Sequence, residues 1–425
     1  MGRKKYTQIC LSDIITTKIY QFEKQEDFMS TVEIKNKYGA LFDIIKSSLW
    51  GFSGQLEVDN KTFEEMEAHC ILALPAAELS QMLLSEELRE RWKCEVFRTV
   101  AFYTRYIHEQ SALPIDVPYV ILKGTSAAQY YPHPELREMG DIDIMVKRED
   151  FLKACSSLIE NGYQEMPRRQ DSGYIRHREF FKNGVLIEVH LYFAEFNNTF
   201  QSEYFDDLIL KNINDSHLLP DLVNGLVLLE HINQHLEEGL GLRQIIDWMM
   251  FVERKLTDEK WKDFQIMAQK TGLEKLALVT THMCEMYLGL STRLWCATAD
   301  PDLCSKMMDY ILCCGNFGTK ISNNKTGINV LSLIGSPLAT LKLFQERGLV
   351  NWKAAHNHMI IRPFAWLYQI GRYLRRGFAR NNAARQINEE YAFAKRRNYL
   401  LNSLGVKRYS KRVVIYKDGQ YKKWN

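Results

Sequence analysis

The sequence predicts an α+β fold, with a small mixed sheet flanked by mainly helical regions. Strand and helix signals alternate over residues 112–200 and end in a hairpin signal, while apolar residues on both sides recur at helical spacing. Hydrophobic residues make up 46% of the 425-residue chain and charged residues 25%, which is enough apolar material for a sizeable core. We therefore expect an N-terminal helical region (1–111), an α/β core (112–200), a helical domain (201–350) and a basic, mainly helical C-terminal region (351–425).

The N-terminal region reads as helical over residues 40–110. One stretch, TFEEMEAHCILALPAAEL, has helical spacing that Pro75 interrupts. A second, SEELRERWKCEVFRTVAFYTRYIHEQ, is a long amphipathic pattern with an acidic first turn, which suits the helix dipole.

The α/β core is expected to begin with a short apolar strand, YVIL at 119–122, just before Gly124. Thr125 then opens a short helix, which Pro132 and Pro134 stop. Glycine lets the backbone approach a phosphate closely, and a helix N-terminus offers free N–H groups. This turn is therefore a candidate phosphate contact, or an ordinary strand-to-helix turn.

The next predicted strand, GDIDIMV, carries two aspartates inside an apolar run. Because side chains alternate along a strand, Ile142 and Ile144 point toward a core while Asp141 and Asp143 share the other face. Two adjacent carboxylates repel each other, and Mg²⁺, which prefers oxygen ligands, would compensate them. The alternative is a solvated strand face. A helix over 149–161 is expected to follow.

Two alternating runs around Asn183-Gly184 predict a β-hairpin. In its second run, VLIEVHLYF, Glu188 and His190 share the polar face. Glu188 would be a third carboxylate, able to complete a metal site or to accept a proton from an attacking hydroxyl. The alternative is a cross-strand partner for Arg176 or Arg178. His190 is expected to touch substrate or to hydrogen-bond Glu188.

Three cations adjoin these motifs. Lys123 precedes the glycine of the first turn, and Arg137 and Lys147 flank the two aspartates. Lysine and arginine can neutralise the charge of bound phosphate groups, although an exposed salt bridge is the preferred explanation for each residue taken singly.

The stretch LKGTSAAQYYPHPELREMGDIDIMV resembles the uncharacterised nucleotidyltransferase family of bacteria, within the DNA-polymerase-beta-type nucleotidyltransferase superfamily. That family shows LKG, a helix, Tyr-Pro, an arginine and GDID, followed by a helix with a Gly-aromatic turn, here Gly162-Tyr163. A strand with an acid and a histidine comes next. The resemblance covers residues 117–255 and departs from the superfamily in having Gly-Thr where Gly-Ser or Gly-Gly is usual.

The resemblance implies transfer of a nucleoside monophosphate from an NTP, dependent on Mg²⁺ or Mn²⁺. Asp141, Asp143 and Glu188 would be the catalytic metal ligands. The expected nucleotide contacts are Lys123, Gly124, Thr125, Ser126 and Arg137. The hydroxyl acceptor stays open among a small molecule, RNA and protein. The rival hypotheses are a non-catalytic nucleotide-binding module and a toxin-like enzyme that modifies tRNA or protein.

Four stretches after residue 220 fit helical spacing, and LLEHINQHLEEGLGLRQIIDW is similar to the family's helical stretch. His231 and His235 lie four residues apart on one helix face. HINQH lacks the glutamate of a metalloprotease motif, so a polar pair at an interface is preferred to zinc. Alternatively, with His190, Arg243 and Asp247, they shape a substrate pocket. An intrahelical Arg243–Asp247 salt bridge is the simpler explanation for that pair.

Cysteine content and the N-terminal sequence favour a cytoplasmic protein. Nine cysteines occur without CxxC or Cys/His zinc spacing, which favours reduced thiols. The N-terminus lacks a signal-peptide pattern, and no apolar run is long enough to span a bilayer.

The charge distribution is asymmetric. Residues 372–425 contain 15 Lys and Arg against 3 Asp and Glu, a local charge of +12, so the preceding residues carry −9 of the net +3. This basic region could bind nucleic acid or an anionic membrane, or dock on the acidic body of the protein. Within it, an aromatic and basic stretch precedes a helical pattern to Leu404 and a hairpin pattern around Asp418-Gly419.

Overall fold

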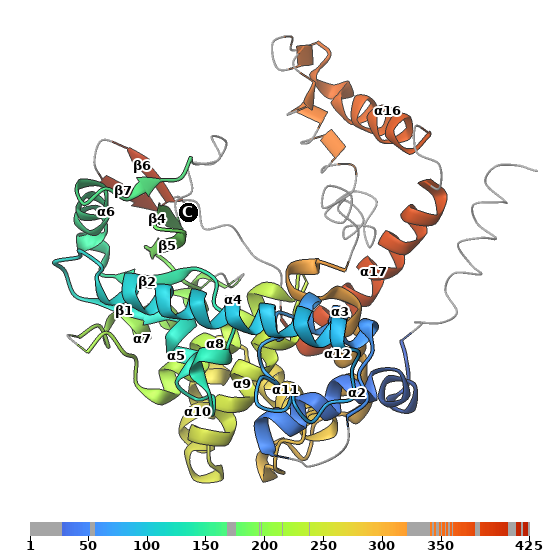
Figure 1. Cartoon of the computed structure of the whole chain (residues 1–425). Coiled ribbons are helices and arrows are strands. Elements are labelled where there is room, and N and C mark those ends of the chain that lie inside the picture. Colours follow the sequence, from blue (N-terminus) through green and yellow to red (C-terminus); the bar gives the residue numbers. More distant parts are fainter. Residues whose placement is uncertain are drawn as a thin grey trace, which may run out of the picture.

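The computed structural model (Figure 1) combines one five-stranded sheet with many helices, which confirms the predicted α+β class. The structure describes residues 28–51, 56–167, 176–194, 196, 198–214, 216–237, 239–320, 341, 344–345, 348–349, 351–352, 354–355, 358, 360–378, 383–406, 414–417 and 420–423. The N-terminal segment and the Asp418-Gly419 turn lie outside these residues.

The sheet has the order β1-β2-β5-β4-β3. Its strands are β1 (Tyr119–Leu122), β2 (Ile142–Val146), β3 (Gln164–Glu165), β4 (His177–Lys182) and β5 (Val185–His190). The central pair, β2 and β5, is parallel, whereas the other neighbouring pairs are antiparallel. The mixed sheet therefore places the aspartate strand directly beside the strand that carries Glu188.

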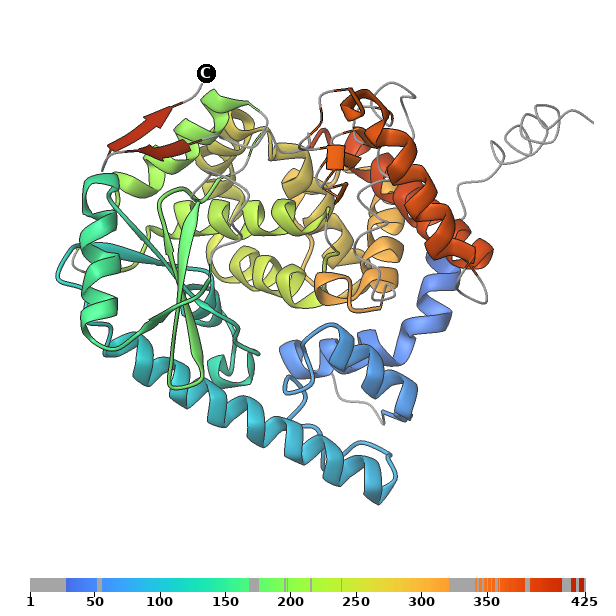
Figure 2. The ribbon, with the colours of Figure 1, turned by 90° about the horizontal axis from the view of Figure 1, so that it is seen from above.

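Alternation along the strands divides their side chains between two cores. Ile142 and Ile144 of β2 join a small core with residues of α6 (Phe151–Glu160). Met145, on the opposite face, joins a large helical core. The prediction that the aspartates avoid the first core is confirmed, but their face is not solvated, because Asp143 is only 1% exposed. Figure 2 shows the sheet standing between α6 and the helices that follow it in sequence.

Local sequence explains the predicted connections. In the β4–β5 hairpin, Asn183 and Gly184 both have positive φ, 52° and 81°, as a two-residue type I′ turn requires. Helix α6 ends at Glu160, and Gly162 follows with φ 80°. Both predictions are confirmed. The helix expected at Thr125 is α5 (Gly124–Ala128), which is only five residues long.

Most of the remaining helices follow the sheet. They are α7 (Thr199–Leu210), α8 (Asp221–His235), α9 (Leu242–Lys255), α10 (Asp258–Thr271), α11 (Glu274–Tyr287) and α12 (Pro301–Cys314). Helices α8 to α11 confirm the four predicted stretches. Helix α10 shows why such boundaries can be predicted from the sequence: Thr257 caps its start, and Gly272 ends it with φ 75°.

Among the described residues, the helices that precede the sheet are α2 (Thr31–Trp50), α3 (Asn60–Ala68) and α4 (Glu86–Ser111). The long α4 confirms the amphipathic prediction and runs from α3 toward the sheet (Figures 1 and 2). The expectation of helical structure interrupted only at Pro75 is wrong, since α3 already ends at Ala68 and turns follow. Buried His69 ends α3, and its imidazole accepts a hydrogen bond from the Leu242 N–H.

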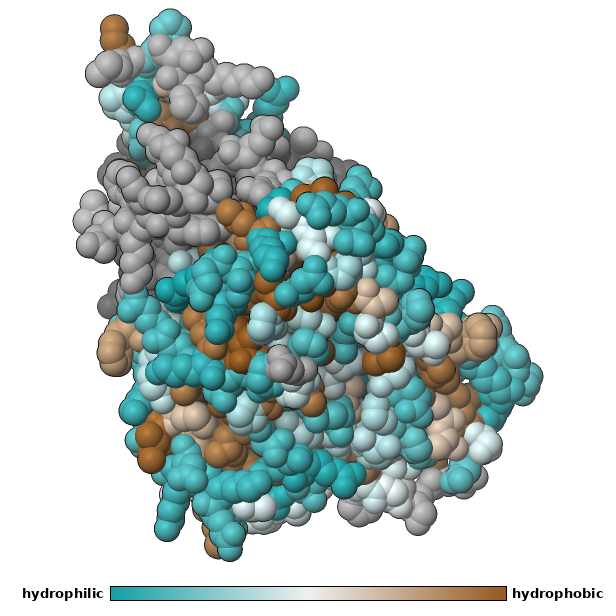
Figure 3. Space-filling model, turned by 90° about the vertical axis from the view of Figure 1, so that its left-hand side faces the viewer, coloured by the Kyte–Doolittle hydropathy of each residue, from teal (hydrophilic) through white to brown (hydrophobic). Residues whose placement is uncertain are grey.

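The C-terminal region contains α16 (Ala365–Phe378), α17 (Ala383–Leu404) and the antiparallel pair β6 (Val414–Lys417) and β7 (Gln420–Lys423). The predicted tail hairpin is thereby confirmed in its two strands. None of the helices in the described ranges combines the length and apolar character needed to cross a membrane. The face seen in Figure 3 is largely hydrophilic, with its hydrophobic residues in separate patches.

Candidate active site

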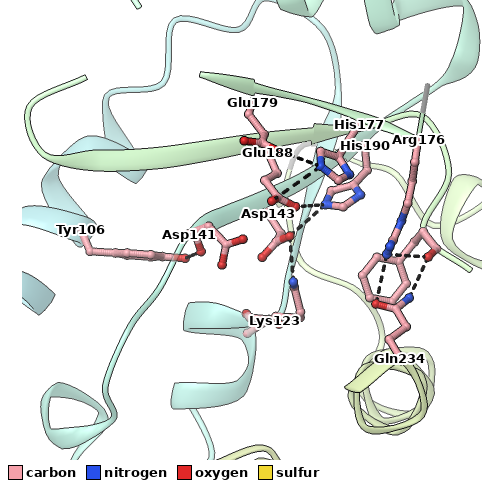
Figure 4. Close-up of polar contacts among 12 residues, drawn as sticks. Tyr106, Lys123, Asp141, Asp143, Arg176, His177, Glu179, Glu188, His190 and Gln234 are labelled. Carbon is pink, nitrogen blue, oxygen red and sulfur yellow. Dashed lines mark hydrogen bonds and ion pairs between the residues drawn. The ribbon is translucent and has the colours of Figure 1, made fainter. Parts of the chain in front are cut away.

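Strand pairing brings the three predicted carboxylates together. Asp143 of β2 and Glu188 of β5 are direct partners across the parallel pair, and Asp141 immediately precedes β2. One oxygen from each carboxylate lies within 4.8 Å of the others, and Figure 4 shows them converging. The Asp141 carbonyl is held from outside the sheet, where it accepts a 3.1 Å hydrogen bond from the Tyr106 hydroxyl of α4.

Asp143 is the buried centre of this group. Its Oδ1 lies 2.8 Å from His190 Nε2 and 2.9 Å from Lys123 Nζ. Its Oδ2 is buried and has no hydrogen-bond partner among the described residues. Such an orphaned carboxylate oxygen is costly to bury, so it marks a place where a further cation or donor fits.

Two histidines surround Glu188. His190 Nε2 lies 3.2 Å from one carboxylate oxygen, and His177 Nε2 lies 3.8 Å from the other. Burial raises the pKa of Glu188, but the hydrogen bond and charge of His190 outweigh burial and hold that pKa at about 2. The predicted contact between His190 and Glu188 is therefore present. Arg178, one of the alternative partners, instead pairs with Glu165.

Strand β1 ends in a strained turn, and the ammonium group of Lys123 in this turn lies beside the carboxylates. Lys123 has φ 54° and Gly124 has φ 45°, so two consecutive residues adopt left-handed φ. Burial lowers the pKa of Lys123, but Asp143 and the neighbouring acids outweigh it, so the pKa is raised. Lys123 and Gly124 line the cavity described below.

The two hydroxyls after this glycine have structural partners. The Thr125 hydroxyl donates to Gln110 Oε1 at 2.9 Å. The Ser126 hydroxyl lies 2.7 Å from the Lys123 carbonyl and 3.1 Å from Asn224 Oδ1. Neither residue belongs to the lining of the cavity, so their predicted triphosphate contacts stay a prediction.

Arg137 and Asp247 form a buried pair rather than two separate substrate groups. The Arg137 guanidinium makes two bonds of 2.6 and 2.7 Å to the Asp247 carboxylate. Tyr131 also donates to this carboxylate at 2.8 Å. The expected intrahelical Arg243–Asp247 salt bridge is therefore wrong, since Arg243 instead donates to the Glu138 carbonyl at 3.0 Å. Arg137 lines the cavity, while Asp247 lies behind it as its counter-ion.

A cavity of about 200 Å³ adjoins the carboxylates. Its lining is rich in cationic and imidazole side chains and comprises Lys123, Gly124, Arg137, Gly140, Asp141, Asp143, Arg176, His177, Glu188, His231, Gln234, His235, Arg243 and Phe317. His231 and His235 thus lie at the cavity, with ring centroids 4.6 Å apart. Burial lowers the pKa of both, that of His235 to about 3, so both rings are neutral near pH 7.

Several lining residues were not singled out as pocket residues from the sequence. Arg176 Nη2 lies 3.0 Å from both the Phe193 carbonyl and Gln234 Oε1 (Figure 4). His177 could have been predicted from the sequence, because a two-residue hairpin turn fixes the strand register, and this register places His177 opposite His190. Phe317 lies far beyond the helices that resemble the family, and no sequence pattern marked it as a pocket residue.

A comparison with known protein families matches the part of the chain that contains these residues. The family model described as "Uncharacterised nucleotidyltransferase" matches residues 57–289, more than half of the chain. The chain belongs to this family. The match covers the sheet, α4 and the helices α8 to α11, and it confirms the family suggested by the GDID motif. No curated protein and no solved structure matches the chain.

Proposed function

We propose that the protein transfers a nucleoside monophosphate from an NTP to a hydroxyl acceptor and releases pyrophosphate, with Mg²⁺ or Mn²⁺ as cofactor. The observation that carries this proposal is the convergence of Asp141, Asp143 and Glu188 beside a cation-lined cavity in a chain of the nucleotidyltransferase family. The orphaned Asp143 Oδ2 suits a divalent cation, since carboxylate oxygens are the ligands Mg²⁺ prefers.

The three carboxylates would hold the metal, which would polarise phosphate oxygens and offset charge on the leaving pyrophosphate. Lys123 and Arg137 line the same cavity and would offset charge on the triphosphate. Glu188 would complete the metal site or accept the proton of an acceptor hydroxyl. Asp247 fixes the guanidinium of Arg137 through two hydrogen bonds.

The test is label transfer. The protein is incubated with each NTP, carrying either an α- or a γ-phosphate label, with Mg²⁺ or Mn²⁺ and a cell extract. We expect an acceptor to gain the α-label but not the γ-label. Asp143→Asn and Asp141→Asn should each reduce transfer at least about 100-fold, because each removes a carboxylate charge from the site. Asp116→Asn, at an exposed aspartate outside the cavity, is the matched control.

The outcomes separate the rival functions. NTP binding that requires Mg²⁺ without any label transfer would indicate a binding module. Growth arrest on expression, abolished by Asp141→Asn, would indicate a toxin-like enzyme. If the folded protein neither binds nor turns over any NTP, the proposal is wrong.

A further inference from the structure

A short turn beyond the family match carries an aromatic ring to the cavity. Phe317 lies in a 3₁₀ turn, Asn316–Gly318, after α12, and residue 289 ends the matched segment. Its side chain lines the same cavity as Asp141 and Asp143, yet 39% of the residue is exposed. An exposed aromatic side chain in a cavity otherwise lined by charged and polar groups offers apolar surface that a ligand can cover.

The backbone conformation and close packing of the turn keep Phe317 at the cavity. Phe317 has φ 52° and ψ 29°, a left-handed conformation that is strained for a bulky residue. A Cβ at Gly239 would lie 2.3 Å from the Gly318 nitrogen, and one at Gly241 would lie 2.9 Å from Asn316 Cα. Only glycines in the α8–α9 connection therefore let the turn approach so closely.

Side chains anchor the same turn. Asn316 is buried; its Oδ1 accepts from Gln244 Nε2 at 2.7 Å, and its Nδ2 donates to Cys70 Sγ at 3.1 Å. Thr319 donates to the Ala68 carbonyl at 3.1 Å. These contacts hold the backbone on both sides of Phe317, and so keep the residue beside the cavity.

His235 adjoins the Phe317 ring, and Arg243 lines the same cavity. The Phe317 and His235 rings meet edge to face, with centroids 4.7 Å apart and an interplanar angle of 82°. His235 Nδ1 and Arg243 Nε are buried without hydrogen-bond partners among the described residues. A flat ring bearing nitrogen or oxygen atoms at its edge would satisfy these groups while covering Phe317.

We propose that Phe317, supported by His235 and Arg243, forms the stacking subsite for the nucleobase of the bound NTP. This inference rests on the proposed function and adds the subsite for the base. An NTP has a highly charged end and a flat aromatic end, and the cavity lining offers partners for both. Lys123 and the carboxylates suit the phosphates, whereas Phe317 is the apolar aromatic ring among the described lining residues. Stacking accepts any base, so discrimination among NTPs would come from His235 and Arg243.

The experiment compares two probes, ATP with Mg²⁺ and inorganic triphosphate with Mg²⁺, by equilibrium binding to the full chain. Phe317→Ala should weaken ATP binding about 5- to 100-fold, the range expected for loss of one base–aromatic stack. Its triphosphate binding should stay within about twofold, and Phe317→Tyr should retain ATP binding. Phe97→Ala, at a 74% exposed phenylalanine of α4 outside the cavity, is the matched control.

The outcomes distinguish this inference from the proposed function. Unchanged ATP binding by Phe317→Ala would overturn the stacking subsite and leave the nucleotidyltransferase proposal standing. Equal weakening of ATP and triphosphate would show that Phe317 only supports the fold of the cavity, and would also overturn the inference. Failure of the wild-type chain to bind any NTP would count against the proposed function itself.

Discussion

At the scale of single residues, the site depends on charges that are buried in compensating pairs. Asp143 has Lys123 and His190 around one oxygen, and Arg137 has Asp247. Arg137 and Asp247 are 4% and 1% exposed, so water cannot replace a missing partner. Removing one member of such a pair should cost far more than removing a surface charge.

The Arg137–Asp247 pair gives the residue-scale prediction. Asp247→Ala should lower the free energy of unfolding by about 3–5 kcal/mol, because it leaves the Arg137 guanidinium buried without its carboxylate. Urea denaturation measures the change. Asp263→Ala, at an exposed aspartate of α10, should change it by less than about 0.5 kcal/mol. If replacing both Arg137 and Asp247 by leucine restores no stability relative to Asp247→Ala, the unpaired charge is not the cause.

At the scale of elements, close packing of α8 on α9 positions the polar residues of both helices at the cavity. Gly225 of α8 makes room for α9, because a Cβ there would lie 2.1 Å from the Phe251 ring of α9. That ring is fully buried and packed against Trp248 and Phe264, so it has little room to move.

Two glycine-to-alanine changes test this packing, and we expect opposite signs. Gly225→Ala should destabilise the protein by about 1–3 kcal/mol through overpacking. Gly39→Ala in α2, where an added Cβ meets nothing within 4 Å, should stabilise it by about 0.5–1 kcal/mol because alanine favours the helix. Thermal and urea unfolding report both changes. A neutral Gly225→Ala variant would contradict the close approach of α8 and α9.

At the scale of the whole molecule, the large core joins regions that are distant in sequence. It takes side chains from α2, α9 and α17, among other helices. The hydrogen bond from the Leu242 N–H to His69 Nδ1, at 3.3 Å, ties the end of α3 to the start of α9. Only neutral imidazole can accept this bond, and burial lowers the pKa of His69 from 6.5 to about 3.

This histidine predicts a pH dependence of stability. The folded-state pKa lies below the unfolded value, so the unfolded chain binds the proton first as the pH falls. The free energy of unfolding should therefore fall progressively as the pH decreases from about 6.5 toward 3. The part of this loss due to His69 is about 3 kcal/mol at pH 4. His69→Asn keeps an acceptor but does not titrate, so its loss of stability between pH 7 and pH 4 should be smaller. Equal losses in the two proteins, measured by urea unfolding, would contradict this role.

Short-range signals predicted much of the fold and the centre of the site. Alternation along GDIDI put Asp141 and Asp143 on one side, and Asn183-Gly184 fixed the hairpin that presents Glu188. Such signals depend on residues only a few positions apart, so they can be read without tertiary contacts. The three boundaries between the four predicted domains stay a prediction, since helices from different ranges share the large core.

The sequence by itself determined the family, the strands β1, β2, β4 and β5 with the helices between them, and the three carboxylates as one candidate set, whereas the two-residue strand β3 was not predicted. Only the tertiary structure decided that Asp143 is buried, that Asp247 pairs with Arg137 rather than Arg243, and that Phe317 reaches the cavity. The reason is physical: alternation and helical spacing fix which face a side chain takes, whereas burial and pairing depend on what packs there. In this protein those neighbours are distant along the chain: Asp247 lies 110 residues after Arg137, and Phe317 lies still farther from Asp141 and Asp143.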